Sequence, residues 1–535
     1  MTGFSNKKLT FLVVDDFKSF RSTVNSMLAS LGVAQVAMAG NGAEALDACR
    51  RKKFDVILCD YDLGPSINGQ RVLESLRHHQ LIDRESIFVL ISADVSKQAV
   101  MAAYDCTPDD YLAKPINAQM LDRRIGRLLD QREVLRPAYK ALENNDPNLS
   151  MAILTKIVLA KGKASLSAQK FLGELFIEHD KLNKAEKLYL NVLEAKPLDW
   201  AKLGLAHEQQ ARGNYEKAGE VFAALTQENP LYLPAYDGMA SNWYLRNNAA
   251  NLQGAIEKSV SVSPMSILRQ KNLANIAEKN GDIPTALKAL RECHRLGKES
   301  CHGSWDDAYQ FGMTTASATS LIATEEKNLP DEALKILKEA TNFFGMPPEK
   351  MLCMQFLQGR LQFLSKNKAA GIAAIEKAEV MYARELQNID TDIARIKALH
   401  TIGFSEKADD LTHSLIHLYA YDQEALEKLD ALLNEPVSEA NRILVSQINR
   451  EGIELYNRGL FDDALACFER ARILFPKHAG IQLNIIQALI GKIKSGDKNE
   501  DLQLEVEEHL LVLENTIDEG HAQYARYKKL STMLK

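Results

Sequence analysis

The 535-residue sequence contains no apolar run long enough to cross a bilayer, and its first residues lack the apolar core of a signal peptide. Its seven cysteines form no CxxC pair, and several of them lie within apolar patterns. Because disulfides are rare in reducing compartments, we expect these cysteines to be buried thiols. The absences together predict a cytoplasmic protein that does not enter a membrane.

An excess of basic residues is also missing. The chain has 65 Lys and Arg against 71 Asp and Glu, a formal net charge of -6. Proteins that bind nucleic acid usually carry a large basic surface, which this balance does not favour. The composition is otherwise that of an ordinary soluble protein, and the length predicts two or more structural units.

Several motifs of known chemistry are absent as well. The sequence shows no helix-turn-helix, no Gly-rich phosphate loop in its C-terminal part and no HExxH. His78 and His79 are adjacent in a predicted helix without a ligand partner nearby, so we expect them to be solvent-exposed. No enzyme signature and no DNA-binding output are therefore predicted.

What is present begins with an alternation of strands and helices in the first 130 residues. Apolar runs rich in β-branched residues predict buried parallel strands, and apolar residues at helical spacing predict the helices between them. Strands are expected at 9–14, 33–38, 54–59, 87–91 and 111–113, and helices at 17–31, 43–51, 69–78, 95–104 and 118–129. Five such units predict a doubly wound, five-stranded parallel sheet.

Polar residues gather where these predicted strands end. An acidic pair, Asp15-Asp16, follows the first strand, Asp60 ends the third, Ser92 ends the fourth, and Lys114-Pro115 follows the last. Taken singly, an aspartate here could be a helix N-cap or a turn residue. Ligands of such sheets bind at the carboxyl ends of the strands, so the joint placement predicts one site.

The motifs in this region resemble a bacterial response regulator receiver domain of the chemotaxis type. The resemblance covers about residues 7–131 and rests on separated motifs that match in order: FLVVDDF at 11–17, Asp60, Ser92-Ala93, and DDYLAKP at 109–115. It implies a flavodoxin-like α/β fold, and we assign residues 1–131 to this domain. A receiver that cannot be phosphorylated is an alternative, although every required side chain is present.

The resemblance also implies a metal and an acceptor. Asp60 would be the phosphoacceptor and a direct ligand of Mg²⁺. Asp16 would bind the metal directly, Asp15 through water, and Asp62 through its backbone carbonyl. Clustered carboxylates would otherwise repel the incoming phosphoryl group, and Mg²⁺ prefers such oxygen ligands.

The resemblance further implies residues that bind the phosphoryl group and residues that change conformation in response to it. Lys114 would supply a positive charge to its oxygens, and Ser92 would donate a hydroxyl. Ser92 and Tyr111 would form the switch pair, and the bond between Lys114 and Pro115 would be cis. Tyr111 could instead be an ordinary half-buried strand residue.

Residues 132–535 show no further strand pattern and no Gly, Ser or Pro-rich linker, so we expect a stiff helical junction after the receiver. A period near 34 residues recurs in this region. One unit contains Gly173, Phe176, Ala185, Tyr189 and Pro197, and another contains Gly452, Leu455, Ala464, Phe468 and Pro476. Small residues let paired helices approach closely, and the aromatic residue fills the space between them.

These units resemble tetratricopeptide (TPR) repeats, which implies an all-α, TPR-like superhelical solenoid with a groove for peptides or protein surfaces. The clearest repeats lie at 166–298 and 445–478, whereas 380–440 is irregular and predicts divergent repeats or a kink. A generic helical bundle is the alternative. We expect an opening hairpin at 133–165 and closing helices at 500–535.

The sequence therefore predicts a non-enzymatic response regulator of two-component signal transduction. A partner sensor histidine kinase would phosphorylate Asp60, and this would control a protein target of the TPR groove, with the kinase or another response regulator as candidate targets. A phosphate sink that drains a shared kinase and an RNA or nucleoprotein-binding scaffold are the alternatives. The receiver's switch face is a common dimer surface in the family, so a dimer is also open.

Overall fold

A computed structural model of the chain describes residues 9–532, apart from 65–66, 84, 94–106, 320–326, 384–387, 434, 476–477, 496–499, 515–516 and 518. The chain forms two compact units. The first comprises residues up to 274 together with 288–304, and the second comprises 275–287 and 305 onward. None of the helices in the described ranges is long and apolar enough to cross a membrane.

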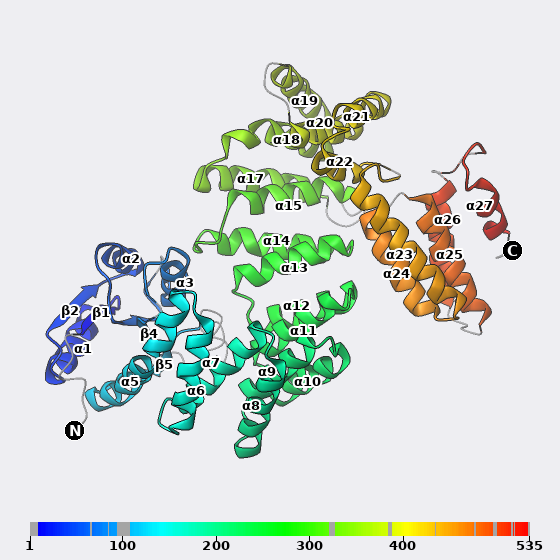
Figure 1. Cartoon of the computed structure of the whole chain (residues 1–535). Helices are drawn as coiled ribbons and strands as arrows, with labels where there is room; N and C mark the ends of the chain where they lie inside the picture. Colours follow the sequence, from blue (N-terminus) through cyan, green and yellow to red (C-terminus); the bar gives the residue numbers. More distant parts are fainter. Residues whose placement is uncertain are drawn as a thin grey trace. The chain divides into compact units, whose positions relative to one another are not determined.

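The first unit begins with the predicted α/β domain (Figure 1). Its described strands form a five-stranded parallel sheet in the order β2-β1-β3-β4-β5. The strands are β1 (Thr10–Val14), β2 (Gln35–Ala39), β3 (Val56–Asp60), β4 (Ile87–Ser92) and β5 (Asp110–Ala113). The helices are α1 (Lys18–Ser30), α2 (Gly42–Arg51), α3 (Gly69–His78) and α5 (Ala118–Glu143).

These elements confirm the doubly wound fold. Except at the C-terminal end of α5, no boundary differs from the predicted one by more than two residues. The predicted helix at 95–104 lies outside the described residues. Apolar side chains of α1 and α5 cover one face of the sheet, and those of α2 and α3 cover the other, so the strand ends are left open for a site.

Helix α5 continues well past the predicted end of the α/β domain. It runs for 26 residues without interruption and contains Pro137 near its C-terminal end. Its first half packs on the sheet through Leu121 and Ile125, and its second half packs on the next helices through Leu135 and Ala138. The junction is thus one shared helix, as expected from the missing linker.

The rest of the first unit is an array of paired helices. They are α6 (Pro147–Leu159), α7 (Ser165–Glu178), α8 (Leu182–Ala195), α9 (Asp199–Ala211), α10 (Tyr215–Glu228), α11 (Leu233–Leu245) and α12 (Ala249–Val262), followed by α13 (Ile267–Lys279) and α14 (Ile283–Gly297), each of which contributes residues to both units. The opening hairpin predicted at 133–165 is formed by the end of α5 and α6.

Close packing of glycine against an aromatic ring explains the repeat motif. Tyr189 of α8 is 1% exposed and lies against Gly173 of α7 and Gly204 of α9. A Cβ atom on Gly204 would come within 2.2 Å of the Tyr189 ring. Gly238 meets Phe222 in the same way, at 2.3 Å. Each aromatic residue therefore fixes the spacing between its own hairpin and the next.

The second unit is also all-α. Its helices are α15 (Trp305–Ser317), α17 (Leu329–Phe344), the 3-10 helix η1 (Pro348–Lys350), α18 (Met351–Leu364), α19 (Lys368–Tyr382), α20 (Ile389–Thr401), α21 (Ser405–Leu418), α22 (Gln423–Asp430), α23 (Glu439–Asn457), α24 (Phe461–Leu474), α25 (Ala479–Lys494), α26 (Glu500–Glu514) and α27 (Tyr524–Ser531). Gly452 of α23 lies against Phe468 of α24, where an added Cβ would come within 2.5 Å of the ring. The TPR-like all-α fold predicted for this part is confirmed.

The irregular segment 380–440 consists mainly of helices where it is described, and the short helix α22 precedes α23 in it. Asp430 closes α22 and is 1% exposed. Its carboxylate accepts hydrogen bonds from the backbone N–H of Val437 at 2.6 Å and from the Ser438 hydroxyl at 2.5 Å. A buried carboxylate thus holds the turn that leads into α23.

Candidate functional site

The sheet order brings the acidic residues together. Strand β1 pairs with β3, with Val14 opposite Cys59, so Asp15 and Asp16 follow one strand while Asp60 ends its neighbour. One carboxylate oxygen from each of these three residues lies within 4.8 Å of the others. Asp15 and Asp60 are buried and Asp16 is exposed. The predicted cluster at the carboxyl edge of the sheet is therefore present.

Lys114 reaches the same cluster from the end of β5. Its Nζ atom lies 2.7 Å from Asp60 Oδ2 and 2.9 Å from Asp15 Oδ2. The ammonium group also sits 4.1 Å from the centre of the Phe20 ring, a favourable cation–π contact. The bond between Lys114 and Pro115 is cis. The lysine thus places its charge directly on the carboxylate that ends β3.

The charged groups in this cluster shift one another's pKa values. Burial raises the pKa of Asp60 to about 6, and the nearby Asp15 carboxylate adds to this shift, while the hydrogen bond and charge of Lys114 oppose it. Burial acts to lower the pKa of Lys114, but its bonds to the two aspartates outweigh burial and raise it. Lys114 is therefore held as a cation by two of the carboxylates, and the negative charge of the three clustered carboxylates favours a further positive charge.

Ser92 and Tyr111 lie on one face of the sheet. Strands β4 and β5 pair with Leu90 opposite Tyr111 and Ser92 opposite Ala113. Since side chains alternate along a strand, Ser92 and Leu90 share a face with Tyr111. Ser92 is buried and Tyr111 is half-buried among the side chains on the α2 and α3 face. The register thus makes them diagonal neighbours.

Asp62 lies beyond the end of β3 and is exposed. Its carboxylate accepts a hydrogen bond of 3.2 Å from the Gly64 N–H, so the side chain stabilises its own loop.

The sequence did not single out Arg21 of α1 as a residue of this site. This arginine donates to the backbone carbonyls of Asp15 and Asp16, and its place in the first turn of the helix that follows the acidic pair is the signal that was available.

Gly69 keeps the loop after Asp60 close to the sheet. A Cβ on this residue would lie 2.1 Å from the Asp60 carbonyl oxygen, and the Gly69 N–H donates to the Tyr61 carbonyl at 2.8 Å.

Gly69→Ala is expected to destabilise the α/β domain by about 1–3 kcal/mol, because backbone atoms must shift. Thermal unfolding measures this change. Gly126→Ala, where an added Cβ meets nothing within 4 Å, is the control and should be neutral or stabilising.

Helix α3 contacts the repeat array, a contact that the sequence did not reveal. Arg71 Nη2 donates to the Met265 carbonyl at 2.9 Å, and Ser300 Oγ lies 3.1 Å from Glu74 Oε2. Arg71 also pairs with Glu74 at 2.8 Å, and its side chain is only 4% exposed. The α/β domain is therefore held to the array through α3 as well as through α5.

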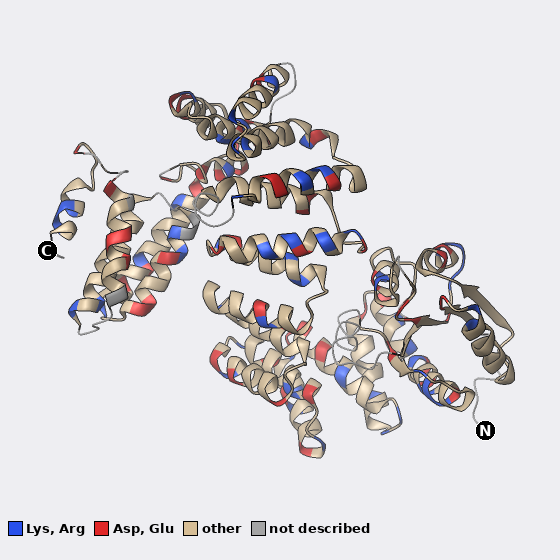
Figure 2. Ribbon diagram, turned by 180° about the vertical axis from the view of Figure 1, so that it is seen from behind, with Lys and Arg blue, Asp and Glu red and all other residues tan. Residues whose placement is uncertain are grey.

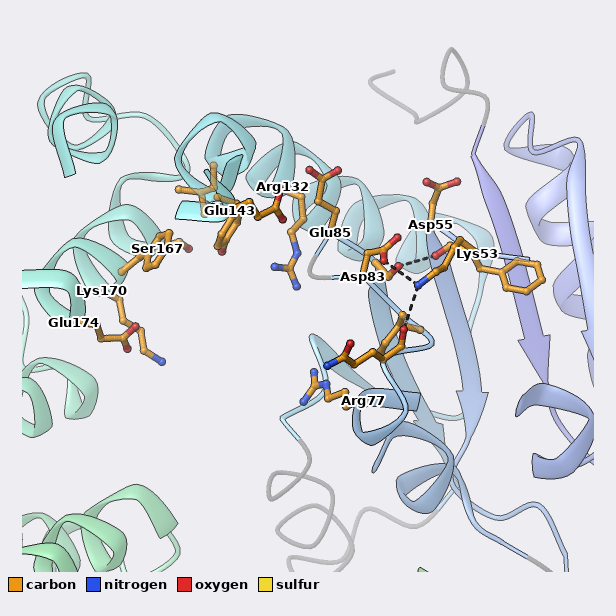
Figure 3. Close-up of a pocket in the computed structure, with 17 residues that line it drawn as sticks. Lys53, Asp55, Arg77, Asp83, Glu85, Arg132, Glu143, Ser167, Lys170 and Glu174 are labelled. Carbon is orange, nitrogen blue, oxygen red and sulfur yellow. Dashed lines mark hydrogen bonds and ion pairs between the residues drawn. The ribbon is translucent and has the colours of Figure 1, made fainter. Parts of the chain in front are cut away.

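A hollow of about 1190 Å³ lies between the α/β domain and the start of the array (Figure 3). One wall carries Lys53, which pairs with Asp83 at 2.9 Å, the other carries Lys170 and Glu174, and Arg132 of α5 lies between them. Its lining mixes acids with bases and faces open solvent. The two parts are thus separated by a charged gap on this side, unlike the close contact at α3.

Known proteins match the two ends of the chain. The family model described as response regulator receiver domain matches residues 11–126, and the one described as tetratricopeptide repeat matches residues 449–495. Chemotaxis protein CheY-3 of Vibrio cholerae serotype O1 is 24% identical over 131 residues, which are 24% of this chain and 99% of that protein. Chemotaxis protein CheY of Pseudomonas aeruginosa is 24% identical over 123 residues, or 23% of this chain and 98% of that protein. The solved structure of chemotaxis response regulator CheY4 of Vibrio cholerae covers 23% of this chain and 100% of its own, with 25% identity and a TM-score of 0.22.

Proposed function

Because the chain joins a response regulator receiver domain to tetratricopeptide repeats, we propose that phosphorylation of Asp60 controls protein binding by the repeat array. The receiver domain makes the chain a two-component response regulator, and the repeats indicate protein interaction. The observation that carries the proposal is the set of three carboxylates and Lys114 at one edge of the sheet. Phosphoryl transfer to an aspartate needs both the carboxylates and the lysine.

Asp60 supplies the nucleophile of this reaction. One of its carboxylate oxygens attacks the phosphorus of a phosphohistidine on a sensor kinase. The P–N bond breaks, its electron pair returns to the imidazole, and an acyl phosphate forms on Asp60. Lys114, which already lies 2.7 Å from Asp60 Oδ2, then neutralises the phosphoryl oxygens, and Ser92 donates its hydroxyl to them.

The acidic residues fit Mg²⁺. Three carboxylates with oxygens within 4.8 Å of one another offer the hard oxygen ligands that this ion prefers. Asp16 and Asp60 would bind it directly, Asp15 through water and Asp62 through its carbonyl. When bound, the ion offsets the negative charge that otherwise repels the phosphoryl group.

Asp16→Asn tests this assignment, since Asp16 is exposed and its loss should not disturb the core. We expect the Mg²⁺ concentration needed for half-maximal phosphorylation by a small phosphodonor to rise at least about tenfold, because even loss of a partner outside the ligand shell weakens metal sites that much. The control is Asp130→Asn, since Asp130 on α5 is likewise exposed. An unchanged Mg²⁺ requirement in Asp16→Asn would remove this residue from the site.

Ser92 and Tyr111 would change conformation in response to phosphorylation. A phosphoryl group adds close to two negative charges and draws the Ser92 hydroxyl toward it, which leaves room for Tyr111 on the same face of the sheet. Phosphorylation would thus shift an equilibrium between two conformations of Ser92 and Tyr111. Tyr111→Ala should leave phosphorylation intact and abolish its effect on partner binding.

The experiment that tests the output compares captured partners of the full chain with and without a phosphodonor, in wild type and in Asp60→Ala. We expect at least one partner whose occupancy changes with the phosphodonor only in wild type. The histidine kinase itself and a sister response regulator are the candidate targets. Equal occupancy of every partner under all four conditions would refute control by Asp60.

Two other functions make different predictions. A phosphate sink requires rapid loss of phosphate from Asp60 and no partner of the repeats, so phosphotransfer and hydrolysis rates separate it from the switch. RNA binding requires a basic surface, but Figure 2 shows acidic and basic residues interspersed along the helices. Salt-dependent RNA binding by the full chain would favour that function.

A further inference from the structure

His78, Cys301 and His302 form a compact cluster in the first unit. His78 ends α3 of the receiver domain, and the other two residues lie in the segment after α14. One potential ligand atom from each residue lies within 4.8 Å of the others. The rings of His78 and His302 meet edge to face, with centres 4.8 Å apart. His78 is exposed, as the sequence predicts, but it has neighbours that the sequence does not reveal, because they lie more than two hundred residues further along the chain.

The cluster is held in place by its surroundings. Lys271 Nζ donates to the His302 carbonyl at 2.7 Å, and Ser300 Oγ bonds to Glu74 at 3.1 Å. On the other side, Arg71 ties α3 to the Met265 carbonyl. Both segments that contribute to the cluster are thus anchored independently of the cluster itself.

The side chains have the chemistry of metal ligands. His78 and His302 each offer an imidazole nitrogen, and Cys301 offers a thiol sulfur. Among the cysteines of the described residues, Cys301 is half-buried whereas the others are buried, so its sulfur is within reach of a metal. Two imidazoles and a thiol suit Zn²⁺ rather than Mg²⁺.

A carboxylate lies beside the cluster. Glu74 Oε1 is 3.7 Å from His302 Nε2, while Glu74 Oε2 is taken by Arg71 and Ser300. The free side of this carboxylate can complete a tetrahedral ligand set or orient His302. A cavity of about 520 Å³, lined by Glu74, His78 and His302 among others, adjoins the cluster and gives a metal a route from solvent.

We propose that His78, Cys301 and His302 bind Zn²⁺, with Glu74 beside them, and that the metal links α3 of the receiver to the repeat array. Binding releases the thiol proton of Cys301 to solvent and involves no redox step. The site is separate from the acidic cluster of Asp60 and does not depend on the proposed phosphorylation.

The test uses the reduced full-length protein, stripped of metal and held in excess Mg²⁺ so that the acidic cluster is occupied. Co²⁺ serves as the spectroscopic probe. We expect one equivalent to produce the near-ultraviolet band of thiolate-to-cobalt charge transfer, and Zn²⁺ to displace it. Cys301→Ser should remove this band. His78→Gln and His302→Gln should each weaken Zn²⁺ binding roughly tenfold or more.

His79→Gln is the matched control, because His79 directly follows α3, is likewise exposed, and is not in the cluster. It should bind Zn²⁺ as wild type does. Circular dichroism of each metal-free variant shows whether it has folded. A folded wild type without the thiolate band, or a band unaffected by His78→Gln and His302→Gln, would overturn the proposal. So would Zn²⁺ binding that survives in Cys301→Ser with unchanged affinity.

Discussion

Asp60→Asn is expected to reduce phosphorylation of the chain by a small phosphodonor to background. The amide has the size of the carboxylate and can still accept a hydrogen bond from Lys114, so the site keeps its shape. It lacks the nucleophilic oxygen, and no acyl phosphate forms. Phosphate-affinity electrophoresis and the mass of the intact protein measure the incorporation of phosphate.

The matched control is Asp47→Asn on α2. Its carboxylate is 55% exposed and pairs with Arg50 on the surface, away from the strand ends. This variant should be phosphorylated as wild type is. Wild-type incorporation in Asp60→Asn would mean that another residue accepts the phosphoryl group. Loss of incorporation in both variants would point to a general defect of folding and not to the site.

Tyr189→Ala should have the largest effect on stability. The ring is 1% exposed and packs against the backbone at Gly173 and Gly204, so its removal leaves a cavity shared by three helices. Truncation of a buried aromatic residue costs about 3–5 kcal/mol. Because the chain has several cooperative parts, the loss is best measured locally. We expect faster amide hydrogen exchange throughout α7, α8 and α9.

Tyr244→Ala on α11 is the control, since that tyrosine is 69% exposed. It removes the same atoms from the surface and should leave exchange in the array unchanged. Exchange in the receiver sheet should be unaffected by either variant. If α7 to α9 remain fully protected in Tyr189→Ala, the packing of small residues on the ring is not what fixes the spacing of these hairpins.

The parts of the molecule that the sequence predicted well depend on local patterns. The strand ends at Asp60 and Ser92 were predictable because an apolar run stops at a polar residue, and parallel strands end at one edge. The packing of Gly173 on Tyr189 was predictable because the spacing within a repeat encodes contacts within a hairpin. In both cases the residues in contact are close in sequence or belong to a recurrent fold.

The contacts at α3 could not be predicted in this way. Arg71 and Glu74 are charged residues on a helix and have the pattern of a solvated face, yet Arg71 is buried against the repeat array. Ser300 and His302 lie in a segment with no periodic pattern. Only the tertiary path of the array brings this segment to α3, and no spacing within the sequence records that path.

Helix α5 acts as a lever arm. Ile125 packs on the sheet and Ala138 packs on the first helices of the array, 13 residues further on (138 − 125). At a rise of about 1.5 Å per residue the arm is roughly 20 Å long, so a tilt of about 5° at the sheet moves its far end by about 1.7 Å. Displacements of that size are enough to repack a helix interface. A tilt of α5 at the sheet would therefore reach the first helices of the array through one continuous helix, with Pro137 near its far end.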